Sequence, residues 1–247
     1  MIRIRDLHKQ LGHKRVLTGV DLEIATGETV VVMGRSGGGK SVLLKHIIGL
    51  MTPDRGSIEI DGEEIVGLKE KELGEIRRRF GMLFQGAALF DSLTVGHNVG
   101  LPLREHLRWR GEPIRERVRE RLEWVGLKDI ENMKPASLSG GMRKRVGLAR
   151  AIVMDPRFIL YDEPTTGLDP VMADVIDQLV RSLQKRMGVT SVVVTHDMKS
   201  AFKVADRVAM LHEGKIVFTG TPEETRNTKD PLVRQFVEGT SEGPIQV

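Results

Sequence analysis

The sequence predicts an α/β fold in which a parallel sheet presents a phosphate-binding loop. The apolar run at 29–33 (TVVVM) has the composition of a strand that is buried on both faces. Residues 34–41 (GRSGGGKS) match the pattern G-x-x-x-x-G-K-[ST], and residues 41–48 continue with helical character. Two further apolar runs, at 158–162 and 190–195, are typical of strands in the same kind of sheet. This strand–loop–helix order is the setting that the loop pattern requires.

The loop at 34–41 has the chemistry of a polyphosphate site. Its glycines leave successive backbone N–H groups free to wrap the phosphates, and the following helix N-terminus adds favourable dipole charge. Lys40 would reach the β- and γ-phosphates, and the Ser41 hydroxyl would bind Mg²⁺. We therefore expect a nucleoside triphosphate and Mg²⁺ as ligands. The predicted binding loop consists of Gly34, Arg35, Ser36, Gly37, Gly38, Gly39, Lys40, Ser41 and Val42.

Antiparallel strands are expected around this core in the first part of the chain. Residues 2–7 and 16–24 alternate between apolar and polar side chains, as half-buried strands do. Residues 57–60 follow a turn and lead into the tight turn Asp61-Gly62, which favours another strand. Residues 79–84 are a further strand candidate.

The pattern becomes helical after Gln85. Residues 94–157 carry helical periodicity and almost no strand signal. Within them, the apolar residues of 114–125 recur at helical spacing while Arg and Glu fill the other faces, which predicts a solvated amphipathic helix. Patterns typical of strands follow at 158–162, 190–195, 207–212 and 215–218. Between them, apolar residues at helical spacing over 171–183 predict a helix that packs on the core.

Composition narrows the class of protein. The chain has 247 residues with 40% hydrophobic content, enough for one sizeable core or two unequal lobes. It has no cysteine, which excludes disulfides, Cys-ligated zinc and Cys-ligated iron–sulfur clusters. The net charge is only +4 with signs mixed along the chain, and aromatics are 4%, so no nucleic-acid partner is expected. No signal peptide and no apolar run of about 18 residues is evident.

Five more short segments follow the loop in a fixed order. They are Phe84-Gln85, Leu138–Met142 (LSGGM), Phe158–Glu163 (FILYDE), Gly167–Asp169 (GLD) and Val192–Asp197 (VVVTHD). With the loop, they resemble the Q-loop, signature, Walker B strand, D-loop and switch histidine of the ATPase subunits of ABC transporters. Met142 stands where that family most often has Gln. The resemblance implies a P-loop NTPase (RecA-like) core with an N-terminal antiparallel β subdomain and an inserted α-helical ABC signature subdomain.

The same resemblance divides the chain. It implies a single ABC ATPase domain over 1–247, with a catalytic core at about 1–84 and 158–230 and a helical subdomain at about 85–157. Residues 231–247 would form a C-terminal tail. The tail has apolar residues on one face of a short helix, and by resemblance it would reach toward a second ATPase subunit; the alternative is a frayed chain end.

The family also implies roles for single residues. Two subunits would pair head to tail and bury two ATP molecules at their interface. Asp162 would bind Mg²⁺ directly or through water, and Glu163 would act as general base on the attacking water. Gln85 would contact Mg²⁺ or the water, and His196 would contact the γ-phosphate. The implied catalytic set is thus Glu163, His196, Lys40 and Gln85, and the implied metal set is Ser41, Gln85 and Asp162.

Residues of the signature and D-loop are implied to act between subunits. Ser139, Gly140 and Gly141 would bind the ATP that the other subunit holds, at a helix N-terminus that suits an anion. Asp169 would bridge the two subunits. Catalysis of this kind consists of positioning and electrostatic stabilisation of phosphoryl transfer to water.

Two positions depart from the family pattern. Leu11 stands where an aromatic residue usually stacks on adenine, so a contribution of about 1–3 kcal/mol is missing or comes from elsewhere. Val42 stands where a Thr usually helps to hold the α-phosphate, which removes one hydrogen bond of roughly 0.5–1.5 kcal/mol.

Two runs indicate a subfamily. Gln85–Val95 (QGAALFDSLTV) and Leu101–His106 (LPLREH) resemble the ATPases of Mla-type, Mce-associated transporters, which move phospholipids between the inner and outer bacterial membranes. This implies a homodimer that works with permease subunits and a Mce-domain substrate-binding subunit. The sequence leaves open whether a small STAS-type regulatory subunit also binds. The place of the homodimer would be the cytoplasmic face of the inner membrane, peripheral through the permeases. The alternatives are another ABC importer or exporter, a soluble ATPase of iron–sulfur assembly, and a regulator without turnover, which the presence of Glu163 and His196 disfavours.

Overall fold

The computed structural model describes residues 1–245, which fall into two compact units. The first unit contains Met1–Leu73 and the described residues from Thr190 onward; the second contains Gly74–Val189. The fold is the expected α/β class, with one antiparallel sheet and a set of mainly parallel strands. The proposed subdomain boundaries near residues 84 and 158 stay predictions.

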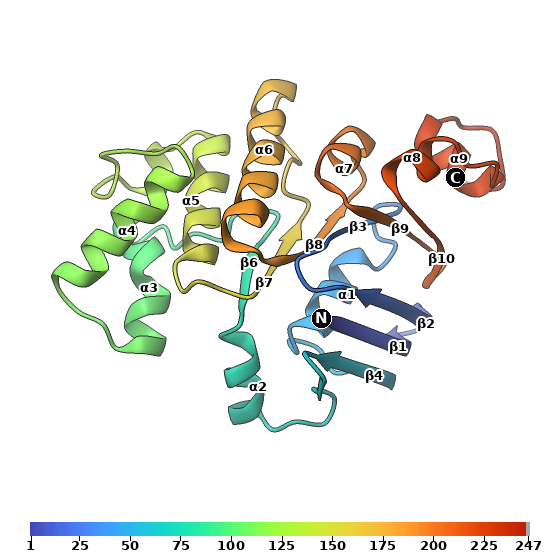
Figure 1. Cartoon of the computed structure of the whole chain (residues 1–247), viewed down its shortest axis with the longest axis horizontal. Coiled ribbons are helices and arrows are strands. Elements are labelled where there is room, and N and C mark those ends of the chain that lie inside the picture. Colours follow the sequence, from blue (N-terminus) through green and yellow to red (C-terminus); the bar gives the residue numbers. More distant parts are fainter. Residues whose placement is uncertain (246–247) are drawn as a thin grey trace. The chain divides into compact units, whose positions relative to one another are not determined.

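The antiparallel sheet lies in the first unit, in the order β2-β1-β4-β5. Figure 1 shows β1, β2 and β4 side by side. Ile2 of β1 pairs with residue 24 on one side and residue 60 on the other, and all three isoleucines are fully buried. The alternating pattern of the sequence thus places one apolar face of this sheet in the core. The strands are β1 (Ile2–Leu11), β2 (Lys14–Ile24), β4 (Arg55–Ile60) and β5 (Glu63–Glu64).

The remaining strands of the first unit follow the order β10-β9-β3-β8. β3 pairs in parallel with both β8 and β9, and β10 pairs antiparallel with β9. Every residue of β3 and β8 is buried, as their continuous apolar runs predict. These strands are β3 (Thr29–Met33), β8 (Thr190–Thr195), β9 (Arg207–His212) and β10 (Lys215–Gly220).

Helices complete the first unit. α1 packs against β8, α7 against β3 and β8, and α8 against α9. α7 and α8 are short, and the apolar pattern did not predict them. The helices are α1 (Lys40–Ile47), α7 (Met198–Val204), α8 (Pro222–Arg226) and α9 (Pro231–Glu238).

The C-terminal tail folds back on α9 of the same chain. The Gln235 side chain is buried; its Nε2 donates to the Ile245 carbonyl at 3.2 Å, and its Oε1 accepts from the Ile245 N–H at 2.7 Å. Ile245 is itself buried. The described tail residues therefore pack on their own helix. The part of the predicted reach toward a second subunit that falls on 246–247 lies outside the described residues.

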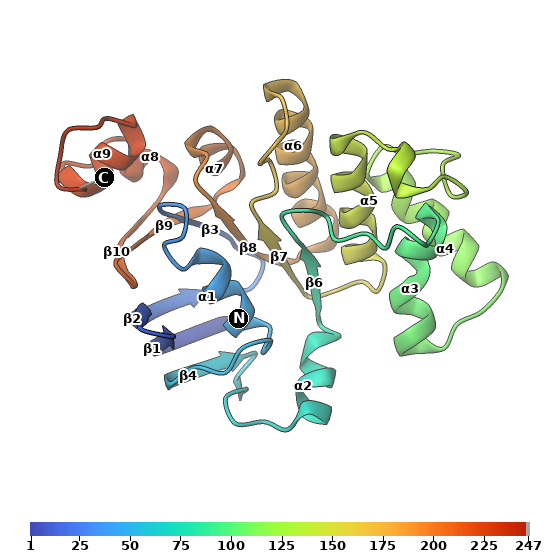
Figure 2. The ribbon, with the colours of Figure 1, turned by 180° about the vertical axis from the view of Figure 1, so that it is seen from behind.

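The second unit combines two parallel strands with a helical cluster. α3, α4 and α5 pack on one another, and α5 packs on β6 (Figures 1 and 2). The rings of Phe80 and Phe158, the first residues of its two strands, stack on each other with centroids 4.7 Å apart. Its strands are β6 (Phe80–Leu83) and β7 (Phe158–Asp162). Its helices are α3 (Val95–Leu107), α4 (Glu112–Trp124), a 3-10 turn (Pro135–Ser137), α5 (Gly140–Ile152) and α6 (Pro170–Met187), while α2 (Glu70–Arg77) crosses the division of the units.

One arginine of α4 corrects the expectation of a wholly solvated polar face. The Arg121 side chain is only 2% exposed and donates to the Asp155 carboxylate. Its guanidinium carbon lies 3.6 Å from the Trp124 ring centroid, and that of Arg186 from α6 lies 3.5 Å from it. Stacking on the indole and the ion pair allow this charge to be buried.

No helix within residues 1–245 is long and apolar enough to cross a membrane.

We predict that His46 makes the first unit sensitive to acid. Burial lowers the pKa of this α1 imidazole below its ordinary value of 6.5, while its Nδ1 lies 2.8 Å from the Val42 carbonyl oxygen. The unfolded chain therefore binds the proton more readily, so stability is complete above about pH 6.5 and falls as the pH drops below it.

Urea unfolding followed by circular dichroism at pH 7.5 and 5.5 measures this difference. His46→Gln should reduce the loss of stability between the two pH values, and His13→Gln, at an exposed histidine, is the matched control. An unchanged loss in His46→Gln would contradict the assignment.

Candidate functional site

The phosphate loop lies in the first unit between β3 and α1, as the sequence predicts. Gly37 and Gly39 adopt φ values of +72° and +98°, which residues with a Cβ rarely adopt. A Cβ on Gly39 would also stand 3.0 Å from Val16 Cγ1 and 3.2 Å from the Val16 carbonyl oxygen. Glycine is required here both by the backbone conformation and by the close approach of β2.

Lys40 lies across this loop. Its side chain is buried, and its Nζ donates to the carbonyls of Gly34 at 2.8 Å and Arg35 at 3.1 Å. Ser41 follows in the first turn of α1, at the positive end of the helix dipole. A cation and a helix N-terminus therefore meet at one end of a glycine-rich loop, which suits the phosphates of a nucleotide.

A cavity of about 260 Å³ borders the loop and α1. Leu11 and Val16 line it together with Lys14 from β2, and Val42 lies at its helical end. The leucine is 42% exposed, so an aliphatic surface is available to a flat ring at the position where the sequence lacks an aromatic residue. The two departures that the sequence indicated, Leu11 and Val42, thus line the same cavity.

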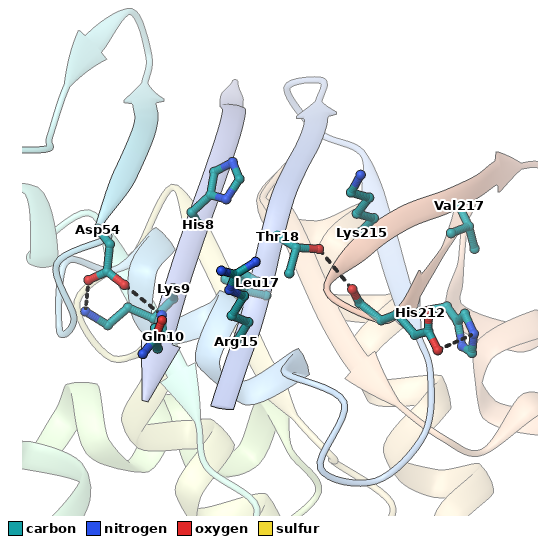
Figure 3. Close-up of a pocket in the computed structure, with 11 residues that line it drawn as sticks. His8, Lys9, Gln10, Arg15, Leu17, Thr18, Asp54, His212, Lys215 and Val217 are labelled. Atoms are coloured by element: carbon teal, nitrogen blue, oxygen red, sulfur yellow. Dashed lines mark hydrogen bonds and ion pairs between the residues drawn. The ribbon is translucent and has the colours of Figure 1, made fainter. Parts of the chain in front are cut away.

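A second cavity of the first unit, about 670 Å³, contains no residue of the phosphate loop (Figure 3). One of the cations that line it, Lys9, is paired: the Nζ donates to Asp54 Oδ1 at 2.8 Å and to the Thr52 carbonyl at 2.8 Å. On its other side the Thr18 hydroxyl donates to the Glu213 carbonyl at 2.9 Å. These bonds brace β1, β2 and the turn before β10 near the loop.

His196 also belongs to the first unit. It is exposed and follows β8, whose last residue Thr195 pairs with Met33 at the end of β3. Because these strands are parallel, His196 and Gly34 leave the sheet at the same edge. Asp197 then caps α7 by accepting from the Lys199 N–H at 2.9 Å, which holds the turn that carries the histidine.

The second unit holds the acidic pair at the end of β7. Asp162 and Glu163 are 8% and 7% exposed, respectively, so both carboxylates emerge from a buried strand. Glu163 has a φ of +49°, an unfavourable backbone conformation for a residue with a side chain. The Thr166 hydroxyl donates to Glu163 Oε2 at 3.1 Å. Strain of this kind at a carboxylate is a feature of functional sites.

Gln85 emerges near this pair. β6 and β7 are parallel with Leu83 opposite Tyr161, so Gln85 and Asp162 follow from the same edge. The next residues Ala87 and Ala88 both have positive φ, +61° and +47°. The loop after β6 is therefore set in an unusual conformation beside the strand that ends in the carboxylates.

The signature and D-loop residues sit at helix starts in the second unit. Ser139 caps α5 by accepting from the Met142 N–H at 3.2 Å, and it is exposed together with Gly140. Gly141 is buried in the first turn of the same helix. Asp169 caps α6 by accepting from the N–H groups of residues 171 and 172 at 3.0 Å each. Two signature residues, Ser139 and Gly140, are thus exposed at a helix N-terminus.

Two basic residues of α5 were missed by the sequence analysis. Lys144 donates to the carbonyls of Gln85 and Glu163, and Arg150 donates to the carbonyls of Ala87 and Ala88. Burial lowers the pKa of both side chains, and the carboxylates near Lys144 oppose that effect. Six residues turn an α-helix by about 600°, so the two side chains lie about 120° apart around the helix axis, and their spacing in the sequence offered no signal.

Each unit therefore gathers part of the predicted site. The first unit carries the phosphate loop, Ser41, Val42 and His196; the second carries Gln85, the acidic pair, the signature and Asp169. Among the described residues, no cluster of three or more His, Cys, Asp or Glu side chains could hold a metal ion by itself. The predicted Mg²⁺ donors are hydroxyl, amide and carboxylate oxygens, the ligand type that Mg²⁺ takes alongside substrate phosphates.

Known proteins match almost the whole chain. A family model described as "ABC transporter" matches residues 17–166. A Mycobacterium leprae protein described as a probable ribonucleotide transport ATP-binding protein is 46% identical over 244 residues, covering 99% of this chain and 70% of that protein. The intermembrane phospholipid transport system ATP-binding protein MlaF of Haemophilus influenzae is 39% identical over 246 residues, covering 100% and 93%.

A solved structure shares both fold and sequence. It is the dimeric post-hydrolysis state of an ATP-binding cassette bound to ADP and inorganic phosphate, with a TM-score of 0.81 and 36% identity. The match covers 90% of this chain and 99% of the cassette. That cassette binds a cleaved nucleotide as a dimer, which agrees with the nucleotide predicted for the loop at 34–41.

We predict that an aromatic ring at position 11 strengthens nucleotide binding. Leu11→Tyr should lower the Kd for ATP by roughly 5-fold to 100-fold, because stacking on a base is worth about 1–3 kcal/mol. Inorganic triphosphate, which has no base, should bind both proteins equally. Leu50→Tyr, at another exposed leucine outside this cavity, is the matched control. Equal ATP affinity in wild type and Leu11→Tyr would show that the base does not lie on this surface.

Proposed function

This chain belongs to the ABC transporter family of ATPases, and we propose that it powers a Mla-type transporter that moves phospholipids between the inner and outer membranes of a bacterium. Membership of this family means that the chain hydrolyses ATP as the ATP-binding subunit of a transporter. The proposal for phospholipids is supported above all by the identity of 39% across 93% of MlaF. The runs at 85–95 and 101–106, which resemble Mla-type ATPases, lie within this alignment and support the same subfamily.

The assembly proposed is a dimer on a membrane complex. ABC cassettes form dimers, as the solved relative does. We assign permease subunits, a Mce-domain substrate-binding subunit and a STAS-type regulator as further partners, by analogy with a complete Mla system. This would place the chain at the cytoplasmic face of the inner membrane, held there by the permeases.

Hydrolysis in this proposal is an in-line transfer of the γ-phosphoryl group to water. Lys40 and the N-terminus of α1 would neutralise charge on the phosphates, while the bound Mg²⁺ would supply electrostatic stabilisation through Ser41, Asp162 and Gln85. Glu163 would accept the proton of the attacking water, and its strained backbone with the Thr166 contact orients the carboxylate. His196 would stabilise the γ-phosphate as charge develops.

The composite site would be completed by the second copy. Ser139 and Gly140 are exposed at the start of α5, where the hydroxyl and the free N–H groups suit an anion from another chain. Asp169 is exposed at the start of α6 and would contact the opposite subunit. We propose that these three residues, with Gly141, act on the ATP that the partner holds.

A second candidate cargo is a ribonucleotide. The mycobacterial relative carries that description and is more similar in sequence, at 46% identity. The ATPase chemistry would be the same for either cargo, because the cargo is handled by other subunits. Transport must therefore decide between them.

We predict that Glu163→Gln nearly abolishes hydrolysis and leaves ATP binding intact. Removing a general base usually costs about 10²–10⁴-fold in rate, while Lys40 and Ser41 still hold the nucleotide. Single-turnover hydrolysis and the Kd for ATP measure the two effects, and Lys40→Ala, which should weaken binding itself, is the contrasting variant. Turnover by Glu163→Gln within a few-fold of wild type would remove Glu163 from this role.

Transport by the purified assembly tests the cargo. The tagged chain is isolated from its native membranes with its associated subunits, and these are placed in proteoliposomes with labelled phospholipids or labelled ribonucleotides. We expect ATP-dependent movement of phospholipid in wild type and none in the Glu163→Gln assembly. Movement of ribonucleotide without lipid would overturn the proposal in favour of the second candidate.

A further inference from the structure

We propose that Lys144 is a positioning residue that links the signature helix α5 to the backbone of both Gln85 and Glu163. The inference rests on the role proposed above for Glu163 as general base. It assigns to Lys144 no contact with nucleotide or water; it acts through the two residues that it holds.

The contacts of Lys144 are made inside the second unit. Its side chain is 5% exposed, and the Nζ donates to the Gln85 carbonyl and, at 3.1 Å, to the Glu163 carbonyl. Both acceptors are backbone atoms, so these two hydrogen bonds set main-chain positions and do not involve the Gln85 amide or the Glu163 carboxylate. Hydrogen bonds from a charged donor are about twice as strong as neutral ones.

The held segments have conformations that need support. Glu163 has a φ of +49°, and Ala87 and Ala88 have φ values of +61° and +47°. Such a backbone conformation is unfavourable for a residue with a side chain and persists only where its surroundings fix it. For Glu163, the bond to its own carbonyl is one of the contacts that fix it, because a peptide rotation there would turn the carbonyl away from Lys144.

The same region of α5 contacts the Gln85 loop at two further positions. A Cβ on Gly147 would stand 3.2 Å from Ala87 Cβ, so helix and loop touch directly. Arg150 donates to the Ala87 carbonyl at 2.7 Å and to the Ala88 carbonyl at 2.8 Å. Residues 144, 147 and 150 thus join α5 and this loop into one body, and of these three it is Lys144 that also reaches Glu163.

A functional consequence follows from the start of α5. The helix is capped by Ser139, which is proposed to bind the ATP of a partner subunit. A shift of α5 away from its position would therefore pull on the Glu163 backbone through Lys144. Because a displacement of about 1 Å in a catalytic group can cost about 100-fold in rate, the link makes hydrolysis depend on where the signature helix lies.

The test separates turnover from binding. In the full chain, Lys144→Met keeps the length and packing of the stem but removes both hydrogen bonds. Single-turnover hydrolysis of bound ATP should fall by about 10-fold to 100-fold, with the Kd for ATP within about 2-fold of wild type. Lys144→Arg can donate to both carbonyls and should restore the rate to within about 3-fold.

Arg145→Met is the matched control. Arg145 is the next residue of α5 and is also partly desolvated, but it donates to the Gly126 carbonyl at 3.1 Å, away from Gln85 and Glu163. Its rate per bound ATP should stay within about 3-fold of wild type. A similar fall in Arg145→Met and Lys144→Met would reduce Lys144 to a residue that merely stabilises α5, and would overturn the proposal.

Other outcomes are equally decisive. Turnover by Lys144→Met at the wild-type rate, in a preparation where Glu163→Gln is inactive, overturns the link and leaves the general base in place. Activity in Glu163→Gln would instead overturn the role of Glu163 itself. If Lys144→Met does not fold, Lys144→Gln is compared with Lys144→Arg: a rate at least 5-fold lower in Lys144→Gln supports the link, and equal rates overturn it.

Discussion

Cationic side chains hold the loops of the site by donating to backbone carbonyls, and the placement of the reactive groups depends on these bonds. A loop that leaves a parallel strand turns its carbonyls away from the sheet, where a buried acceptor without a partner costs about 1–3 kcal/mol. Lys40 satisfies two such carbonyls in the phosphate loop, Lys144 two at the Gln85 loop and the acidic pair, and Arg150 two more. Lysine and arginine donate to several acceptors at once, so one residue can fix two segments.

The sequence predicted those elements whose burial is complete or regularly periodic. The runs at 29–33, 158–162 and 190–195 are strands with the predicted bounds, because a strand buried on both faces must be apolar throughout. α2, α7 and α8 were not predicted, since these short helices carry little periodic signal. α1 and α9 also have only eight residues, but α1 follows the loop motif and α9 has its apolar residues on one face. Arg121 was misplaced because its burial depends on Trp124 and Asp155, and the second of these lies 34 positions away.

Much of the site could be placed from motifs, because each motif residue follows directly from a strand end or a helix start that its own sequence forms. Gly34, Asp162 and His196 all stand where the apolar run before them stops. Lys144 could not be found this way. Its acceptor on Gln85 is 59 positions away and is a carbonyl that any residue type would offer, so no pattern of side chains records the contact.

The pairing of Trp124 with two guanidinium groups has an optical consequence. The sequence contains two tryptophans, at 109 and 124, and both belong to the second unit. Indole emission therefore originates in the unit that carries the signature helix and not in the one that carries the phosphate loop. Because Arg121 and Arg186 lie on the Trp124 ring, its spectrum reports on the packing of α4 against the end of α6. A change in tryptophan fluorescence on adding nucleotide would thus report a change in the surroundings of the indole rings of the second unit.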